Sequence, residues 1–142
     1  MSSKIYLILI MIALGMALTG CGTKEWGVRV VAKGNINPNE NELTAPVAIF
    51  VYQLSSKKNF LDIPYEKLAM GEKFDGYIYR DSWVIWPNQK REYKCNLLEE
   101  SKYIGIVVGY HELEAKKWKA VKKIGFAKRS IKIEVGPLGI KE

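Results

Sequence analysis

Residues able to perform catalysis or to bind a metal are sparse in this sequence of 142 residues. It contains one histidine, His111, and two cysteines, Cys21 and Cys95. No H-x-x-x-H or C-x-x-C spacing occurs, and G-x-S-x-G, P-loop and G-x-G-x-x-G motifs are absent from the sequence. A single histidine at the end of an apolar run is more often solvated than a ligand, so the sequence predicts no metal site, no cofactor and no enzyme.

Cys21 is the residue whose surroundings indicate a defined reaction. Lys4 precedes an apolar run from Ile5 to Ala17, which is the pattern of a secretory signal. A helix of that length rises about 20 Å, too little for a hydrocarbon core of about 30 Å, so a spanning anchor is the less favoured interpretation. Leu18-Thr19-Gly20-Cys21 then resembles a bacterial lipobox. The resemblance implies that the Cys21 thiol receives a diacylglycerol and its freed amine a third acyl chain, although an ordinary cysteine beside an ordinary cleavage site is the alternative.

This resemblance also predicts how the chain is organised. Residues 1–20 are expected to be a lipoprotein signal peptide, 21–26 an acylated N-terminus with a short tether, and 27–142 a single domain. The only expected prosthetic group is the covalent lipid on Cys21. Residue 22 is Gly rather than Asp, which in Gram-negative bacteria directs lipoproteins to the outer membrane. The expected location is therefore the inner leaflet of the outer membrane, with the domain facing the periplasm.

The two cysteines have different expected roles. Acylation of Cys21 would leave Cys95 alone, so no internal disulfide is expected in a monomer. Tyr93, Cys95 and Leu97 alternate and would share one face of a strand. This placement favours a buried, inert thiol over a reactive or intermolecular one.

Basic residues are concentrated near the C-terminus. Removal of the signal would lower the formal net charge from +7 to +6, because it takes away Lys4. Between Lys116 and Lys132 there is no acid, and the basic residues there are Lys116, Lys117, Lys119, Lys122, Lys123, Lys128, Arg129 and Lys132. Export makes nucleic acid implausible as a partner. The run is expected to be a solvated pair of strands, or a surface attracted to anionic headgroups or an acidic partner.

Strand patterns dominate the sequence from residue 27 onward. Apolar and other residues alternate from Val28 to Lys33, while Pro46 to Leu54 is apolar on both faces and should form a central, doubly covered strand. Further strands are expected at Ser82–Trp86, Arg91–Leu97, Tyr103–His111, Trp118–Phe126 and Arg129–Val135. A tight turn precedes Arg91, since Asn88 tolerates positive φ. Seven or so short strands predict an all-β fold, an antiparallel two-sheet β-sandwich.

One segment, around residues 63–71, interrupts the β pattern. Pro64 suits the first helical position, Asp62 the cap region and Gly71 the exit from a helix. The helical spacing of Tyr65, Leu68 and Ala69 would pack this short helix against the sandwich, together with Phe60.

Several of these segments, in their order, resemble one family: the outer-membrane lipoprotein of the type VI secretion system, the TssJ (SciN-like) family. Pro46-Val47-Ala48-Ile49-Phe50-Val51-Tyr52-Gln53-Leu54 is similar to its P-V-x-V-x-V-Y-Q-L strand. The other similar segments are Ile36-Asn37-Pro38, the helix with Phe60, Tyr65 and Leu68, the turn Trp86-Pro87-Asn88-Gln89, Tyr103-Ile104-Gly105-Ile106-Val107-Val108, and Trp118. Two departures are Asn88, where the family has Gly, and His111-Glu112, where it has an arginine.

The resemblance implies a transthyretin-like sandwich with a helical addition, and a function. Such lipoproteins bind the periplasmic C-terminal domain of the inner-membrane component TssM and anchor the secretion complex to the outer membrane. In the family the loop between the first two strands makes this contact. Here those residues are Asn35, Ile36, Asn37, Pro38, Asn39, Glu40, Asn41, Glu42, Leu43 and Thr44. A solvated connector is the alternative role for each of them.

A second hypothesis remains open at this point: an envelope lipoprotein that binds glycan or lipid through its basic and aromatic strands. Trp83 and Trp86 could stack on sugars, but they fall on opposite faces of one strand. No small-molecule substrate is expected under the first hypothesis.

Overall fold

The computed structural model describes residues 3–4, 24–114, 116–125 and 129–142. The predicted signal peptide apart from residues 3–4, the predicted lipidation site Cys21 and the end of the predicted strand at Phe126 lie outside the described residues. Within the described part of the chain, no helix is both long enough and apolar enough to span a membrane.

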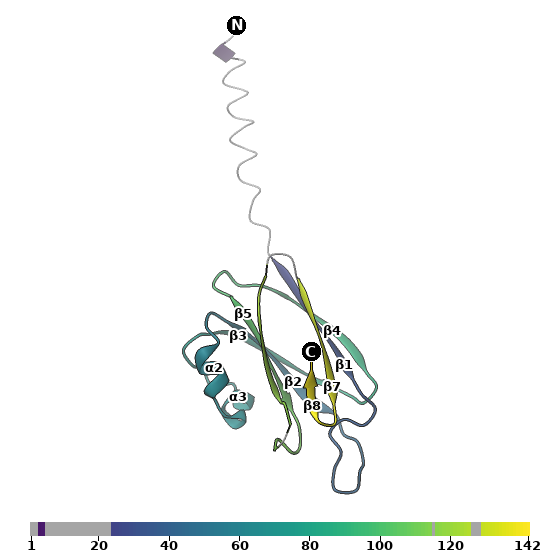
Figure 1. Cartoon of the computed structure of the whole chain (residues 1–142). Helices are drawn as coiled ribbons and strands as arrows, with labels where there is room; N and C mark the ends of the chain where they lie inside the picture. Colours follow the sequence, from purple (N-terminus) through teal and green to yellow (C-terminus); the bar gives the residue numbers. More distant parts are fainter. Residues whose placement is uncertain (1–2, 5–23, 115, 126–128) are drawn as a thin grey trace.

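Two four-stranded sheets form the described domain (Figure 1). The first sheet has the order β4-β1-β7-β8 and contains β1 (Glu25–Ala32), β4 (Lys90–Asn96), β7 (Ser130–Gly136) and β8 (Gly139–Lys141). The second has the order β3-β2-β5-β6 and contains β3 (Tyr77–Ile85), β2 (Val47–Leu54), β5 (Tyr103–Gly109) and β6 (Lys119–Lys123). One cluster of buried apolar side chains joins the two sheets. The predicted all-β sandwich is therefore confirmed.

One pair of strands, β1 with β7, is parallel, whereas all other pairs are antiparallel. The chain leaves the second sheet after β6 and enters the first beside the start of β1, where the Gly27 amide donates to the Arg129 carbonyl at 2.8 Å. Strands that start side by side must run in the same direction. A pattern of alternating residues carries no information on direction, so the sequence did not predict this pair.

Strand ends differ from the prediction by a few residues. β1 begins at Glu25, before the predicted domain start at residue 27, because Trp26 pairs with Cys95 and its side chain is buried in the core. β5 ends at Gly109 rather than at His111, which is exposed. β8 was not predicted, since its three residues are too short to show a period.

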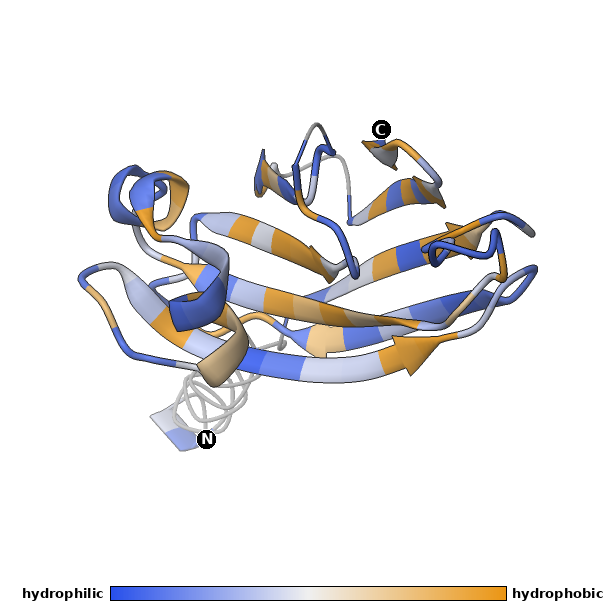
Figure 2. Ribbon diagram, turned by 90° about the horizontal axis from the view of Figure 1, so that it is seen from below, coloured by the Kyte–Doolittle hydropathy of each residue, from blue (hydrophilic) through white to orange (hydrophobic). Residues whose placement is uncertain are grey.

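β2 is the strand with both faces buried, as predicted. Val47, Ile49 and Val51 point into the core between the sheets. The alternate residues Phe50, Tyr52 and Leu54 pack against the helices on the opposite face. Figure 2 shows the helices beside the strands, with hydrophobic residues recurring along the strands.

Two short helices cover the outer face of β2, where the sequence predicted one. α2 spans Lys58–Asp62 and α3 spans Tyr65–Met70. Pro64 separates them, because proline has no N–H and forces the preceding Ile63 into an extended conformation (ψ 132°). Pro64 therefore occupies the N-cap of α3, not its first helical position. The predicted helix exit is confirmed, since Gly71 is left-handed with φ 75°.

Cationic side chains hold the C-terminal ends of both helices. Lys119 Nζ donates to the carbonyls of Phe60 (2.7 Å), Leu61 (3.0 Å) and Ile63 (2.7 Å). Arg80 Nη2 donates to the Ala69 carbonyl at 2.7 Å. Helix carbonyls at this end lack intrahelical partners, so these bonds fix the helices to the sheet. The expectation that the basic run is solvated is thus wrong for Lys119, which is half-buried, and desolvation lowers its pKa.

Gly105 shows why the Y-x-G strand needs glycine at this point. A Cβ added there would lie 2.6 Å from Phe60 Cζ, which is itself fully buried. We predict that Gly105→Ala lowers the free energy of unfolding by about 1–3 kcal/mol, because the ring cannot move away without strain. Gly125→Ala is the control, since nothing lies within 4 Å of its added Cβ. Equal urea midpoints for the two variants would show that the contact is unimportant.

Candidate partner-binding site

The predicted binding loop projects from one end of the sandwich, opposite the end at which β1 begins (Figure 1). It joins β1 to β2, and the structure divides its residues into two groups. Ile36 and Asn37 are buried, and Pro38 is half-buried. The exposed residues are Asn35, Asn39, Glu40, Asn41, Glu42, Leu43 and Thr44. Only this second group, which forms the tip, is placed to contact a partner with its side chains.

Asn37 fastens the base of the loop to the domain. Its Nδ2 donates to the Pro46 carbonyl at 3.1 Å, and its Oδ1 accepts from the His111 amide at 2.6 Å. Its φ of 46° lies in the left-handed region, which asparagine tolerates better than most residues. The Asn-Pro pair of the sequence is therefore a structural anchor that ties the loop to the segment after β5.

Asn39 organises the exposed tip. Its Oδ1 accepts from the amides of Asn41 (2.9 Å) and Leu43 (3.0 Å), and its carbonyl accepts from the Glu42 amide at 2.9 Å. These bonds hold Glu42 at a positive φ of 59°. The tip is thus a defined turn that presents two carboxylates, Glu40 and Glu42, beside the Leu43 side chain, which is 64% exposed.

Other loops bring exposed apolar side chains to the same end. The turn after β3 lies beside the loop, because the Asn88 amide donates to the Lys33 carbonyl at 3.3 Å, and it carries Trp86, which is 60% exposed. The turn between β7 and β8 carries Leu138, which is 81% exposed, and the Lys33 amide bonds to Val135 at the end of β7. Sequence reasoning considered Trp86 only as a sugar-stacking residue, and it missed Leu138. The signal in the sequence that could have found Leu138 is a large apolar residue inside a turn.

Exposed carboxylates also gather at this end of the domain, among lysines that include Lys33 and Lys90. Glu40 and Glu42 lie on the loop tip, and Glu112 and Glu114 lie in the connection after β5 that Asn37 contacts. All four side chains are exposed. We call this end, with Leu43, Trp86 and Leu138, the loop-side surface.

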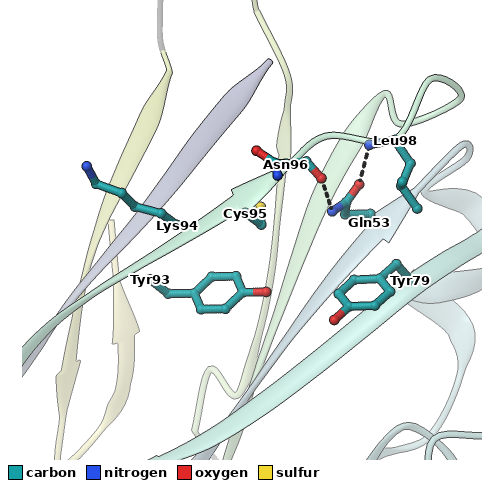
Figure 3. A pocket seen from close by; sticks show the side chains of 7 residues that line it. All are labelled: Gln53, Tyr79, Tyr93, Lys94, Cys95, Asn96 and Leu98. Carbon is teal, nitrogen blue, oxygen red and sulfur yellow. Dashed lines mark hydrogen bonds between the residues drawn. The ribbon is translucent and has the colours of Figure 1, made fainter. Parts of the chain in front are cut away.

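A pocket of about 280 Å³ lies elsewhere, between the edges of the two sheets (Figure 3). Its lining residues are Gln53, Tyr79, Tyr93, Lys94, Cys95, Asn96 and Leu98. Gln53 uses its amide within the protein: Nε2 donates to the Asn96 carbonyl at 3.0 Å, and Oε1 accepts from the Leu98 amide at 2.9 Å. The pocket's buried carboxamide therefore holds a loop and is not available for a ligand.

Cys95 also lines this pocket, and its environment disfavours reactivity. The residue is 8% exposed, as predicted for a buried thiol. Burial raises the pKa of the Cys95 thiol, and Asp81 and Glu25 add to the effect. A thiol kept protonated is a poor nucleophile.

Two residues of the second hypothesis, Trp83 and Lys122, are engaged within the protein. Trp83 is buried and stacks on Tyr93 with ring centroids 4.8 Å apart, whereas Trp86 points outward, so the two are on opposite faces as predicted. Lys122 is paired with Glu142 at 2.7 Å. In the described ranges, no group of three or more His, Cys, Asp or Glu side chains could hold a metal ion.

Comparison with known proteins identifies the family of the chain. Residues 24–137 match the model of the family described as type VI secretion lipoprotein, which includes VasD, EvfM and TssJ. The chain belongs to this family. The match runs from the start of β1 to the turn after β7 and so covers all strands of the β-sandwich except β8. No curated protein sequence is detectably similar to the chain.

Solved structures share the fold at low sequence identity. The T6SS lipoprotein TssJ1 from Pseudomonas aeruginosa superposes with a TM-score of 0.76 at 22% identity, covering 84% of this chain and 95% of that one. Lip of Serratia marcescens, a membrane-bound component of the type VI secretion system, gives 0.75 at 19% identity over 84% and 96%. A chain of the structure described as the T6SS protein TssM C-terminal domain (869–1107) from EAEC gives 0.71 at 19% over 83% and 96%.

The Asn37 side chain should control the order of the loop. We predict that Asn37→Ala lowers the free energy of unfolding by about 1–3 kcal/mol, because it leaves the His111 amide and the Pro46 carbonyl without their partner in the protein. Amide hydrogen exchange of residues 39–44 should also accelerate. Asn41→Ala, an exposed substitution in the same loop, is the control and should change neither measurement. Unchanged exchange in the Asn37 variant would mean that the tip orders itself.

Proposed function

We propose that this TssJ-family lipoprotein anchors the type VI secretion membrane complex to the outer membrane. Its acyl chains on Cys21 hold one end of the domain at the inner leaflet, and the loop-side surface binds the periplasmic C-terminal domain of TssM. The role is structural, with no catalysis and no small-molecule substrate. The observation that carries the proposal is that an ordered, exposed loop lies at the opposite end of the domain from the N-terminal attachment.

The length of β1 supports this division into two ends. The strand starts at Glu25, four positions after Cys21, and ends at Ala32, three positions before the loop begins at Asn35. Eight residues of strand rise about 26 Å, so the loop is held well away from the membrane and faces the periplasm. Besides this geometry, the orientation of the loop depends only on the family assignment and on the predicted lipobox.

The loop-side surface has the properties of a protein-binding site. Its tip is already ordered by Asn39, so binding costs little conformational entropy. The tip alone is too small for a stable interface, which needs about 800 Å² on each partner. Trp86 and Leu138 extend it with apolar area, and the surrounding carboxylates favour a partner with a basic rim. One of the structural matches comes from a structure described as the TssM C-terminal domain.

The anchor should depend on the sulfur of Cys21. We predict that Cys21→Ser leaves the domain folded but moves it from the membrane fraction to the soluble periplasmic fraction when export uses a conventional cleavable signal. The physical reason is the loss of acyl chains, each methylene of which contributes about 0.8 kcal/mol of membrane attachment. Labelling with a radioactive fatty acid should be lost in parallel. Persistent membrane fractionation of the unlabelled variant would refute the tethering mechanism.

Leu43 should be an energetic centre of the TssM contact. We predict that Leu43→Ser weakens binding of the mature chain to the TssM C-terminal domain by about tenfold or more, because an exposed leucine on a rigid tip is suited to fill a pocket. Surface plasmon resonance measures the affinity. Leu61→Ser, which changes an exposed leucine on α2, is the matched control.

Point substitutions at the tip are more informative than removal of the loop. Deleting residues 35–42 would also remove the buried Ile36 and Asn37 and so damage the fold. Equal affinities for the Leu43 and Leu61 variants would exclude the loop tip from the interface.

A further inference from the structure

The end of the domain nearest Cys21 carries a second surface that the partner-binding function does not use. Hydrogen bonds gather three chain segments around Lys24, the first described residue of the domain. The Leu97 amide donates to the Lys24 carbonyl at 2.8 Å, and the Gly27 amide to the Arg129 carbonyl at 2.8 Å. The Ile124 amide donates to the Lys102 carbonyl at 2.9 Å, which brings the end of β6 to the same place.

Basic side chains predominate on this end. Lys102, Lys123 and Arg129 are exposed, and the described structure gives their side chains no acidic partner within ion-pair distance. Lys57, also exposed, lies over the ring of Tyr103, the residue that pairs with Lys123. Glu99 and Glu100 are the acids of the neighbouring loop, so the four basic residues leave an excess of two positive charges. We call this the anchor-side surface.

The opposite end of the domain does not share this positive excess. Glu40, Glu42, Glu112 and Glu114 lie there together with Lys33, Lys90, Lys116 and Lys117, so the charges of that end are mixed. An anionic membrane would therefore attract the anchor-side surface more strongly than the loop-side end.

The tether is too short to hold the anchor-side surface away from the membrane. Three peptide units separate Cys21 from Lys24 and span at most about 11 Å. The polar headgroup region is itself several ångströms deep, so the end of the domain must be within reach of the phosphates. This step rests on the proposed lipidation of Cys21.

Leu98 adds an apolar side chain to this surface. It follows Leu97 directly, its amide is fixed by Gln53 at 2.9 Å, and its side chain is 48% exposed. An exposed leucine among lysines is the composition of surfaces that rest in the membrane interface, with apolar atoms toward the acyl chains and amines at the phosphates.

We propose that the anchor-side surface docks on the anionic phospholipid headgroups of the membrane that holds the chain. Lys57, Lys102, Lys123 and Arg129 lie over headgroup phosphates, and Leu98 enters the interface. So few charges bind weakly when free in solution. The short lipid tether raises their local concentration to the order of millimolar or above, so the docked orientation is the populated one. Docking then fixes the angle at which the loop-side surface points into the periplasm.

The test uses the mature, lipidated chain reconstituted in vesicles of phosphatidylethanolamine and phosphatidylglycerol at about three to one, containing a lipid with a spin-labelled headgroup. A fluorophore attached to Leu98→Cys reports contact with headgroups, and one attached to Leu43→Cys reports the opposite end. The buried Cys95 does not compete for labelling of the folded protein. We expect strong quenching at position 98 and little at position 43.

Charge substitutions separate docking from simple proximity. Lys102→Glu with Lys123→Glu should reduce the ratio of docked to undocked protein by roughly tenfold or more, seen as lost quenching at position 98. Lys90→Glu with Lys141→Glu changes the net charge equally at exposed sites outside this surface and should have no effect. If the glutamate variant unfolds, Lys102→Gln with Lys123→Gln should still reduce quenching. Salt at about 0.5 M should act in the same direction.

Several results would overturn the proposal. Equal quenching at positions 98 and 43 would show that the domain has no preferred orientation. If the probe at position 98 is quenched equally in pure phosphatidylcholine vesicles and in vesicles that contain phosphatidylglycerol, the headgroup charge is not recognised. Equal quenching in the Lys102/Lys123 variant and the Lys90/Lys141 variant would show the same. A chain that does not remain with the vesicles would refute the lipid anchor of the proposed function and this inference with it. A chain that remains bound but shows an unquenched Leu98 probe would refute only the docking.

Discussion

The architecture depends on the burial of both faces of strand β2. Val47, Ile49 and Val51 need the other sheet, while Phe50, Tyr52 and Leu54 need a separate cover, and a two-layer sandwich supplies only the first. The two helices exist to provide the second. They are too short to be stable alone, so their position depends on contacts with the sheet. Those contacts include a hydrogen bond from the Tyr52 hydroxyl to the Leu68 carbonyl and the bonds made by Lys119 and Arg80.

Two buried carboxamides hold loops at the two ends of this sandwich. Asn37 and Gln53 are the buried polar side chains of the described residues, and most of their hydrogen bonds go to backbone groups of loops and strand ends. Gln53 Oε1 also accepts from the Ser101 hydroxyl at 2.7 Å. Asn37 orders the base of the proposed partner-binding loop, and Gln53 orders the loop that carries Leu98. Buried amides with hydrogen-bond partners stabilise a single loop conformation at little cost to the core. The same chemistry therefore orders both proposed surfaces.

The sequence predicted more of the fold than of the candidate site. Period-two alternation found β1 and β7, and a continuous apolar run found β2. Gly71 marked the exit from α3 because its backbone requirement is local. The parallel pairing of β1 with β7 and the role of Lys119 depend on contacts between distant segments, which a local pattern does not report. The loop between β1 and β2 was selected through a family resemblance. Which of its residues face outward was visible only once Asn37 was seen to bond to His111.

The position of β1 has a mechanical consequence. The strand is flanked on both sides, by β4 and by β7, and its two ends lead to the proposed lipid attachment and to the proposed partner-binding loop. Under the proposed function, a pull between the secretion complex and the membrane would enter the domain at the two ends of this strand. Force along a strand paired on both sides loads its hydrogen bonds in shear, so they resist together, whereas a peeled edge strand would lose them one at a time. The strand that locates the two proposed surfaces is thus also suited to resist tension between them.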